Sequence, residues 1–86
     1  MTAVIIRGGK INGKRILKAW ESFGGWYWFA VDKVEERPGD ILWFGFVIGI
    51  EPEWGYFSQR EIESLAPLAW EIKKWDLPFV SKEVKA

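Results

Sequence analysis

An unbroken uncharged stretch of ten residues, at positions 41–50, dominates the hydrophobic pattern of the chain. Its length fits a buried strand or a short buried helix, and periodicity alone does not separate the two. Two glycines favour a strand, because Gly45 and Gly49 would each cost about 1 kcal/mol inside a helix. The remaining Ile, Trp, Phe and Val residues suit a pleated surface. We therefore predict a central strand over residues 41–50.

The two faces of this strand differ, because side chains alternate along a strand. One face is wholly apolar and is predicted to be core: Leu42, Phe44, Phe46, Ile48 and Ile50. The other face has gaps at Gly45 and Gly49, where a helix, another backbone or a partner can approach closely. This second face is a candidate interaction surface.

Three predicted strands precede the central one. Residues 3–7 form a short strand that ends at a Gly-Gly turn. Residues 14–22 fit a helix about as well as a strand, but a hairpin loop at Gly24 and Gly25 favours a strand. Residues 26–35 are aromatic and β-branched, as strands are. A Pro-Gly turn then leads into the central strand.

The segment after the central strand predicts a turn, a brief strand and a capped helix. Residues 51–55 read as the turn, and Tyr56 and Phe57 as the strand. Ser58 and Glu61 have the spacing of a capping box, in which each side chain bonds the backbone amide of the other residue. A helix is therefore predicted to begin at Ser58.

The end of the chain gives weaker signals. The helix is predicted to turn Ile62 and Leu65 inward and to stop before Pro67, which disfavours helical backbone at the preceding residue. Residues 68–80 fit either a helix or an extended return along the sheet. Residues 81–86 are predicted to be frayed.

These elements predict a single α+β domain over residues 1–86. It would contain a small antiparallel meander sheet of four or five strands, with one short capped helix after the central strand. The chain is long enough for one modest core. Seven tryptophans among 86 residues make large rigid side chains the main packing material of that core.

Composition argues against an enzyme. The chain has no histidine and no cysteine, so the usual general base, the nucleophilic thiol and the imidazole and thiolate metal ligands are missing. No phosphate-binding or dinucleotide-binding loop is present, because Gly45 and Gly49 lie within a predicted strand. We expect neither catalysis nor a cofactor.

Glu51 and Glu53 form the one carboxylate pair with a suggestive spacing. Such a pair can hold Mg²⁺ or Ca²⁺, or act as an acid and a base in a cleft. The alternatives are two solvated turn residues, or a pairing with the basic N-terminal region.

Charge is unevenly distributed in a chain of zero net charge. The first twenty residues hold five basic residues and no acidic one, whereas residues 21–65 hold nine acidic and three basic residues. This asymmetry predicts either an anionic partner or ion pairs between neighbouring strands. Nucleic acid would be bound by cations beside stacking aromatic rings, and the candidates are Lys10, Lys14, Arg15, Lys18, Trp20, Trp26 and Trp28. The alternative is that these tryptophans are core.

The favoured expectation is a protein-interaction module that binds an unknown protein or a second copy of itself. A glycine-notched face and an exposed edge strand suit such binding. The candidate face comprises Trp43, Gly45, Val47, Gly49 and Trp54. The alternative is that the C-terminal segment covers this face.

The cellular location and the source of the protein are predicted from features that the sequence lacks or contains rarely. No signal peptide is visible, and the longest apolar run is about half of a membrane span, so we expect a cytoplasmic protein without membrane contact. The chain has one asparagine, one glutamine and one methionine beside abundant Lys, Arg and Glu, a bias typical of hyperthermophiles.

The string at residues 44–58, FGFVIGIEPEWGYFS, followed by EIESL at residues 61–65, resembles a family known as domain of unknown function 2958. The resemblance extends over residues 18–65, while residues 1–13 and the tail from Trp70 depart from the family pattern. Members are often carried by plasmids and other mobile elements, so the resemblance implies a plasmid or viral origin. It implies no activity and no functional residues.

Overall fold

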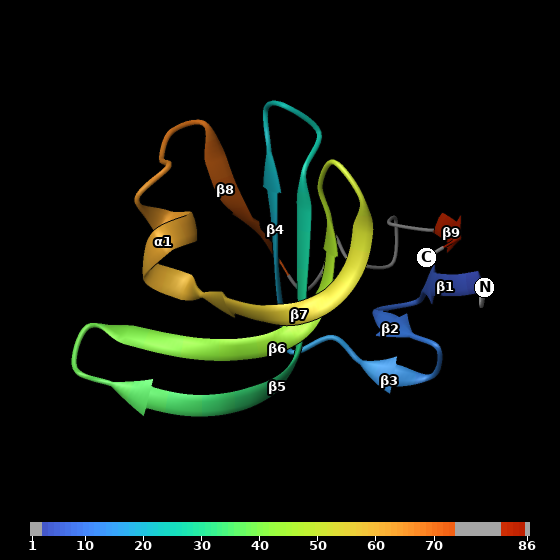
Figure 1. The fold of residues 1–86 in the computed structure, drawn as a ribbon, viewed down its shortest axis with the longest axis horizontal. Coiled ribbons are helices and arrows are strands. Elements are labelled where there is room, and N and C mark those ends of the chain that lie inside the picture. The colour runs from blue at the N-terminus through green and yellow to red at the C-terminus, as the bar shows by residue number, and fades with distance from the viewer. Residues whose placement is uncertain (1–2, 74–81, 86) are drawn as a thin grey trace.

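The computed structural model describes residues 3–73 and 82–85, and Figure 1 shows two antiparallel sheets and one short helix. The predicted α+β fold is confirmed. In chain order the elements are β1 (Ala3–Arg7), β2 (Lys10–Ile11), β3 (Lys14–Arg15), β4 (Lys18–Ser22), β5 (Tyr27–Arg37), β6 (Asp40–Ile48), β7 (Pro52–Ser58), α1 (Gln59–Glu63), β8 (Ala69–Ile72) and β9 (Lys82–Lys85).

The larger sheet has five strands in the order β7-β6-β5-β4-β8. Strands β4 to β7 form the predicted antiparallel meander, with the predicted central strand as β6. The chain then returns to the free edge of β4, where Ala19 pairs with Ile72 and Ser22 pairs with Ala69. The C-terminal segment is therefore a strand over residues 69–72, and residues 74–80 lie outside the described part.

A second sheet, in the order β3-β2-β1-β9, was not foreseen from the sequence. Residues 14–22 were predicted as one strand, which is wrong because β3 and β4 belong to different sheets. The break falls at Ile16 and Leu17. The amide of Ile16 donates to the carbonyl of Gly9 in the small sheet (2.9 Å), and that of Leu17 donates to Ala30 in the large one (2.8 Å).

The predicted fraying at the C-terminus is wrong for residues 82–85. These residues form β9, which pairs antiparallel with β1, with Val84 opposite Val4. This pairing joins the first and the last described strands, β1 and β9, which lie side by side in Figure 1. Contacts between segments this far apart leave no trace in local hydrophobic periodicity.

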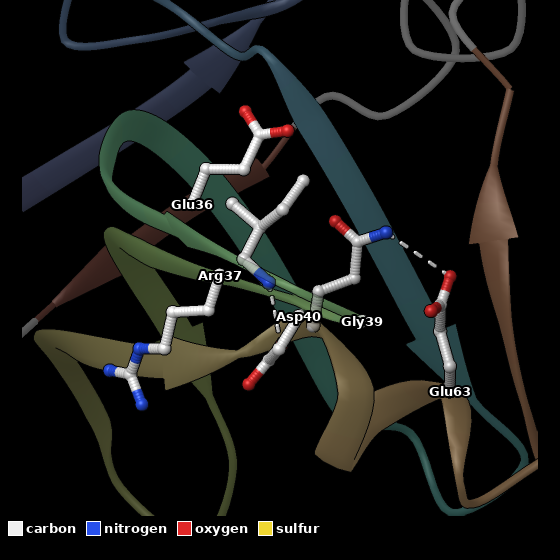
Figure 2. Close-up of a pocket in the computed structure, with 7 residues that line it drawn as sticks. Glu36, Arg37, Gly39, Asp40 and Glu63 are labelled. Carbon is white, nitrogen blue, oxygen red and sulfur yellow. Dashed lines mark hydrogen bonds between the residues drawn. The ribbon is translucent and has the colours of Figure 1, made fainter.

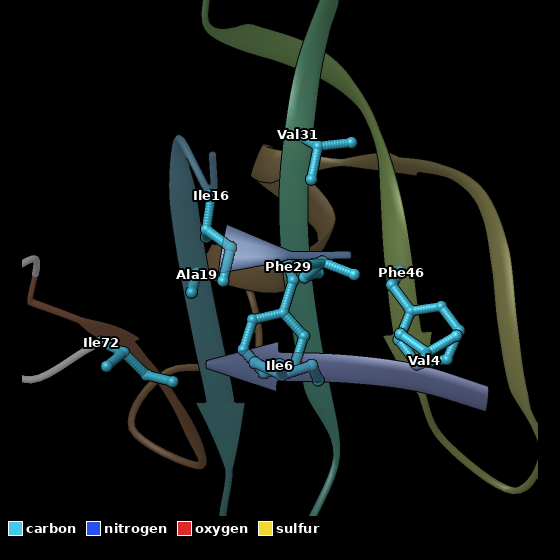
Figure 3. Close-up of a cluster of buried hydrophobic side chains, with 9 residues drawn as sticks. Val4, Ile6, Ile16, Ala19, Phe29, Val31, Phe46 and Ile72 are labelled. Atoms are coloured by element: carbon cyan, nitrogen blue, oxygen red, sulfur yellow. The ribbon is translucent and has the colours of Figure 1, made fainter. Parts of the chain in front are cut away.

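The main core lies between the two sheets. Alternate residues of β4, β5 and β6 point toward the small sheet, and Figure 3 shows Val4 and Ile6 of β1 lying across Phe29 and Phe46. The buried members of this cluster are Val4, Ile6, Ile11, Ile16, Ala19, Phe29, Val31, Phe46 and Ile72. The first predicted core face of the central strand thus contributes through Phe46, with Phe44 and Ile48 packed against the cluster.

A second cluster covers the opposite face of the large sheet beneath α1. Trp20, Trp28 and Trp43 dominate it, and Ala30, Ile62 and Ala69 complete its buried members. The ring centroids of Trp20 and Trp43 are 6.5 Å apart. Both faces of the large sheet are therefore covered over its middle, which explains the apolar residues on both sides of these strands.

The helix is shorter than predicted, although its cap is as predicted. The hydroxyl of Ser58 accepts a hydrogen bond from the amide of Glu61 at 3.2 Å, and Ile62 is buried. Leu65 was predicted to point inward, but it lies in the turn after the helix and is 46% exposed.

Strand β7 is longer than predicted. Residues 52–55 belong to the strand, and the turn lies earlier, around residues 49–51. Pro52 is tolerated because it begins a strand at the edge of the sheet, where its missing N–H costs little. Ile50, predicted as core, is in this turn and is 91% exposed.

Candidate functional site

The glycine-notched face of β6 is filled largely from within the chain. Trp43 is 5% exposed, and its Nε1 donates to Oε1 of Gln59 at 2.9 Å. A Cβ at Gly45 would overlap the carbonyl oxygen of Phe29, and a Cβ at Gly49 would overlap the ring of Trp26. Of the alternatives left open by the sequence, a neighbouring backbone therefore occupies the gap at Gly45, and an indole ring of the same chain occupies the gap at Gly49.

Two hollows remain on this face of the sheet. One has a volume of about 290 Å³ and is lined by Trp26, Val47, Gly49, Ile50, Glu51 and Glu53. The other has a volume of about 240 Å³, beside the helix, and is lined by Trp28, Phe57, Ser58, Glu61, Ile62 and Leu65. The partly buried Val47 belongs to the wall of the first.

Trp54 lies on the opposite face from Trp43, so the five residues of the predicted interaction face do not form one surface. The β6–β7 register pairs Phe46 with Trp54 and Phe44 with Tyr56. Ring centroids are 5.2 Å apart for the first pair and 5.1 Å for the second. These four rings form a continuous aromatic row.

The outer part of this aromatic row is exposed. Trp54 is 39% exposed and Tyr56 is 68% exposed. Both belong to β7, which is the outermost strand of its sheet and has only β6 as a neighbour among the described strands. Tyr56 was not among the predicted site residues. The spacing of Trp54 and Tyr56, two residues apart in a strand, is the signal that places both on one face.

Glu51 and Glu53 are exposed and line the hollow beside Trp26. In the described part of the chain, no group of three or more His, Cys, Asp or Glu side chains is placed to hold a metal ion. The pair reads as two solvated carboxylates beside an indole.

The predicted nucleic-acid residues are not brought together as a stacking platform. Trp20 and Trp28 are buried, and the ring of Trp26 packs against that of Trp28, with 5.8 Å between the ring centroids. Lys14 pairs with Asp32 at 2.7 Å and Lys18 with Glu71 at 3.7 Å, as expected if the basic and acidic parts neutralise each other. The remaining two candidates, Lys10 and Arg15, are exposed.

A polar pocket of about 240 Å³ lies beside the β5–β6 turn (Figure 2). Its lining residues are Glu36, Arg37, Gly39, Asp40, Ile41, Gln59 and Glu63. Its carboxylates contact other parts of the fold, because Glu36 pairs with Lys33 at 3.0 Å and Glu63 accepts from Gln59 at 3.3 Å. The pocket is thus lined by groups already engaged in structural contacts.

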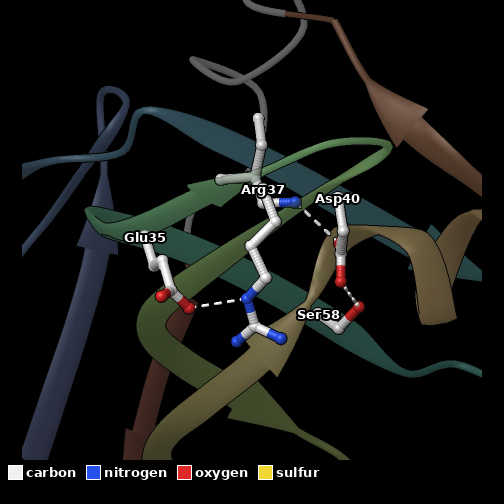
Figure 4. Close-up of polar contacts among 5 residues, drawn as sticks. Glu35, Arg37, Asp40 and Ser58 are labelled. Atoms are coloured by element: carbon white, nitrogen blue, oxygen red, sulfur yellow. Dashed lines mark hydrogen bonds and ion pairs between the residues drawn. The ribbon is translucent and has the colours of Figure 1, made fainter.

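Asp40 connects this turn to the start of the helix (Figure 4). Its Oδ2 accepts from the hydroxyl of Ser58 at 2.7 Å, and its Oδ1 accepts from the amide of Ile41 at 2.7 Å. Its Oδ1 also accepts from the amide of Arg60 at 2.9 Å. The Arg60 amide, followed by the Ser58 hydroxyl, lowers the pKa of Asp40 below its usual range. These hydrogen bonds at the start of the helix stabilise the charged carboxylate, which explains the lowered pKa of Asp40.

Among the described residues, Tyr27 is the other titratable group whose pKa is clearly shifted. Burial raises the pKa of Tyr27, and the nearby Glu21 carboxylate, which accepts from its hydroxyl at 3.1 Å, raises it further. Tyr27 packs against the core between the sheets, with its ring stacked on Phe29 at 5.7 Å. Tyr27 is therefore a partly buried residue at the edge of this core.

No family model, curated protein or solved structure matches the chain. The resemblance to domain of unknown function 2958 therefore stays a prediction. Over the part of the chain that the structure describes, no helix has the length and hydrophobicity needed to cross a membrane.

Proposed function

We propose that the chain is a non-catalytic protein-interaction module that binds its partner along strand β7. The observation that carries the proposal is the combination of an outer strand of seven residues with two exposed aromatic side chains on one face, Trp54 and Tyr56. An outer strand offers unpaired N–H and C=O groups to another chain. Added strands gain affinity from these main-chain bonds and specificity from alternate side chains.

The aromatic pair suits a protein partner. Trp and Tyr are enriched among the residues that dominate binding energy at protein interfaces. Phe44 and Phe46 support the two rings from β6, which reduces the side-chain entropy lost on binding. The absence of His and Cys from the sequence, and the structural causes of the Asp40 and Tyr27 pKa shifts, support a non-catalytic role.

The proposal is tested with Tyr56→Lys, which places a charge on the outer strand. Immobilised wild-type protein, incubated with extract of the source cells, should retain a protein that the immobilised Tyr56→Lys variant does not retain. Once purified, that retained protein should bind wild type directly. Phe23→Lys is the matched control, because Phe23 is a strongly exposed aromatic in the β4–β5 loop, away from β7. Equal retention by all three proteins would contradict the proposal.

A second candidate partner is single-stranded nucleic acid, on a different surface from the one predicted. Lys14, in the hairpin of β2 and β3, forms an ion pair with Asp32. Asp32 and Tyr56 both pair with Phe44, Asp32 from β5 and Tyr56 from β7. Lys14 thus lies on the same face as the exposed aromatic row, as cations do in stacking platforms. Tryptophan quenching by an oligonucleotide at low salt, lost in Lys14→Glu, would support it, and no quenching would exclude it.

The source of the chain remains a separate proposal. The family resemblance supports a plasmid or virus, in which case the partner would be encoded by the same element or its host. The scarcity of Asn, Gln and Met supports a hyperthermophile. A thermal midpoint in the mesophile range of about 45–65 °C would contradict the latter.

A further inference from the structure

Strand β7 lacks the features that usually protect sheet edges. Natural edges are blunted by shortness, by lysines, by proline or by bulges. The outer strand β3 of the small sheet fits this rule, because it has two residues and both are basic. Strand β8, at the other edge of the large sheet, has four residues. Strand β7 has seven residues, its only charge is Glu53, and its proline is at the first position. The edge is therefore open to pairing over nearly its whole length.

We infer that β7 pairs antiparallel with β7 of a second copy of this chain, about a twofold axis at Gly55. The inference rests on the proposed function, since it names the occupant of the same edge. Gly55 is the middle residue of Pro52–Ser58, so this register alone pairs all seven residues. The same surface then serves both copies, as a twofold dimer requires.

Aromatic packing favours this register. It places Trp54 of one copy opposite Tyr56 of the other, and the reverse, on the same face of the joined sheet. Aromatic cross-strand pairs stabilise a sheet relative to alanine pairs. Because Tyr56 already packs on Phe44 and Trp54 on Phe46, the aromatic row would continue from one copy into the next. The rings that are exposed in one chain would be covered in the pair.

The other face of the strand raises no obstacle. Open space surrounds the position of a Cβ at Gly55, so the two glycines can meet at the axis. Glu53 would lie opposite Phe57 of the second copy. The two Glu53 side chains would be four residues out of register, about 13 Å apart along the strands, so like charges do not face each other.

A cysteine at the axis tests the register directly, because the natural chain has none. Gly55 does not have a positive φ, and its Cβ position is open, so Gly55→Cys is compatible with the strand. Opposed residues in an antiparallel pair have Cα atoms about 4.5–5.5 Å apart, within reach of a disulfide. Glu53→Cys is the matched control, since its two copies would be too far apart to bridge.

The expected result is that Gly55→Cys forms a reducible, disulfide-linked dimer under mild oxidation, while Glu53→Cys forms no disulfide-linked dimer. Wild type should also self-associate with rising concentration in analytical ultracentrifugation, and Tyr56→Lys should lose this association. The wild-type measurement does not depend on the cysteine variants folding. A wild-type monomer at every concentration, equal cross-linking of both cysteines, or a dimer unaffected by Tyr56→Lys would each overturn the inference.

Failure of this inference is distinguishable from failure of the proposed function. If wild type is monomeric but a purified source protein still binds it and not Tyr56→Lys, the occupant of β7 is that protein and the second copy is excluded. If neither a second copy nor a source protein binds in a Tyr56-dependent manner, both proposals are wrong.

Discussion

Gly45 of β6 lies against the carbonyl oxygen of Phe29 on β5, so closely that no side chain fits between them. The contact occurs where Gly45 pairs with Ala30, one step before the first of two register shifts in β5. Shifts of this kind bend a strand and increase its twist, and Figure 1 shows β5 and β6 strongly curved. The absence of a side chain at Gly45 thus permits the bend in a sheet whose two faces are both covered by packed side chains.

Gly45→Ala should destabilise the protein far more than Gly49→Ala. At Gly45 the obstacle is backbone, which cannot move without breaking the β5–β6 pairing, and we expect a loss of about 3 kcal/mol. At Gly49 the obstacle is the far end of the half-exposed Trp26 side chain, which can swing outward at a cost of about 1 kcal/mol. Urea unfolding measures both. Equal losses would show that the sheet relaxes around Gly45.

Asp40 should make the stability of the fold sensitive to acid. Its pKa is lowered in the folded state, chiefly by the Arg60 amide and then by the Ser58 hydroxyl. Its contribution is therefore present above the unfolded Asp pKa, near 3.8, and is lost as the pH falls through the lower folded value. Asp40→Asn should flatten this acid-dependent decrease in the free energy of unfolding.

Ser58→Ala is the companion variant to Asp40→Asn. It keeps the carboxylate but removes one of its donors and the helix cap, so it should cost about 1 kcal/mol at neutral pH and reduce the acid dependence only in part. Denaturant unfolding at a series of pH values measures both effects. An acid dependence in Asp40→Asn identical to that of wild type would contradict the assignment.

The elements that sequence predicts well are those with local causes. Glycines within an apolar run marked β6, a Pro-Gly pair marked the turn before it, and the Ser58 spacing marked the helix start. Each signal acts within a few residues through backbone preference or capping. The meander and the α+β class follow from such signals.

The parts that sequence could not predict depend on long-range pairing. The small sheet includes a pairing of β9 with β1 across the whole chain. The break between β3 and β4 occurs because the amides of Ile16 and Leu17 donate to different sheets. Likewise, the gaps at Gly45 and Gly49 were visible, but not that Phe29 and Trp26 fill them. The candidate site therefore lies at Trp54 and Tyr56, on the face of the large sheet opposite to Trp43.

Ile62 and Leu65 should differ sharply in their contribution to stability. Both were predicted to point inward, but only Ile62 is buried, in the tryptophan-rich cluster under the helix. Ile62→Ala should cost about 2–4 kcal/mol through lost burial and the cavity left behind, whereas Leu65→Ala should cost less than about 1 kcal/mol. Thermal or denaturant unfolding distinguishes the two. Comparable losses would mean that Leu65 packs inward in solution.

Tyr27 should ionise only above the ordinary tyrosine range. Its pKa is raised from 10.0, first by burial and then by the hydrogen bond and negative charge of Glu21. The stability that Tyr27 contributes is therefore present below the unfolded pKa and is lost as the pH rises through the folded value. Since the chain has two tyrosines, Tyr56→Phe leaves Tyr27 as the one phenol to follow by ultraviolet absorbance.

Adding Glu21→Gln to that background separates the two causes of the Tyr27 shift. The neutral amide removes the negative charge but leaves the burial, which is the larger cause. The pKa of Tyr27 should therefore fall, while staying above its ordinary value. A titration midpoint unchanged by Glu21→Gln would show that the carboxylate does not act on the phenol. A return to the ordinary value would show that burial contributes nothing to the raised pKa, and that Tyr27 does not pack against the core between the sheets.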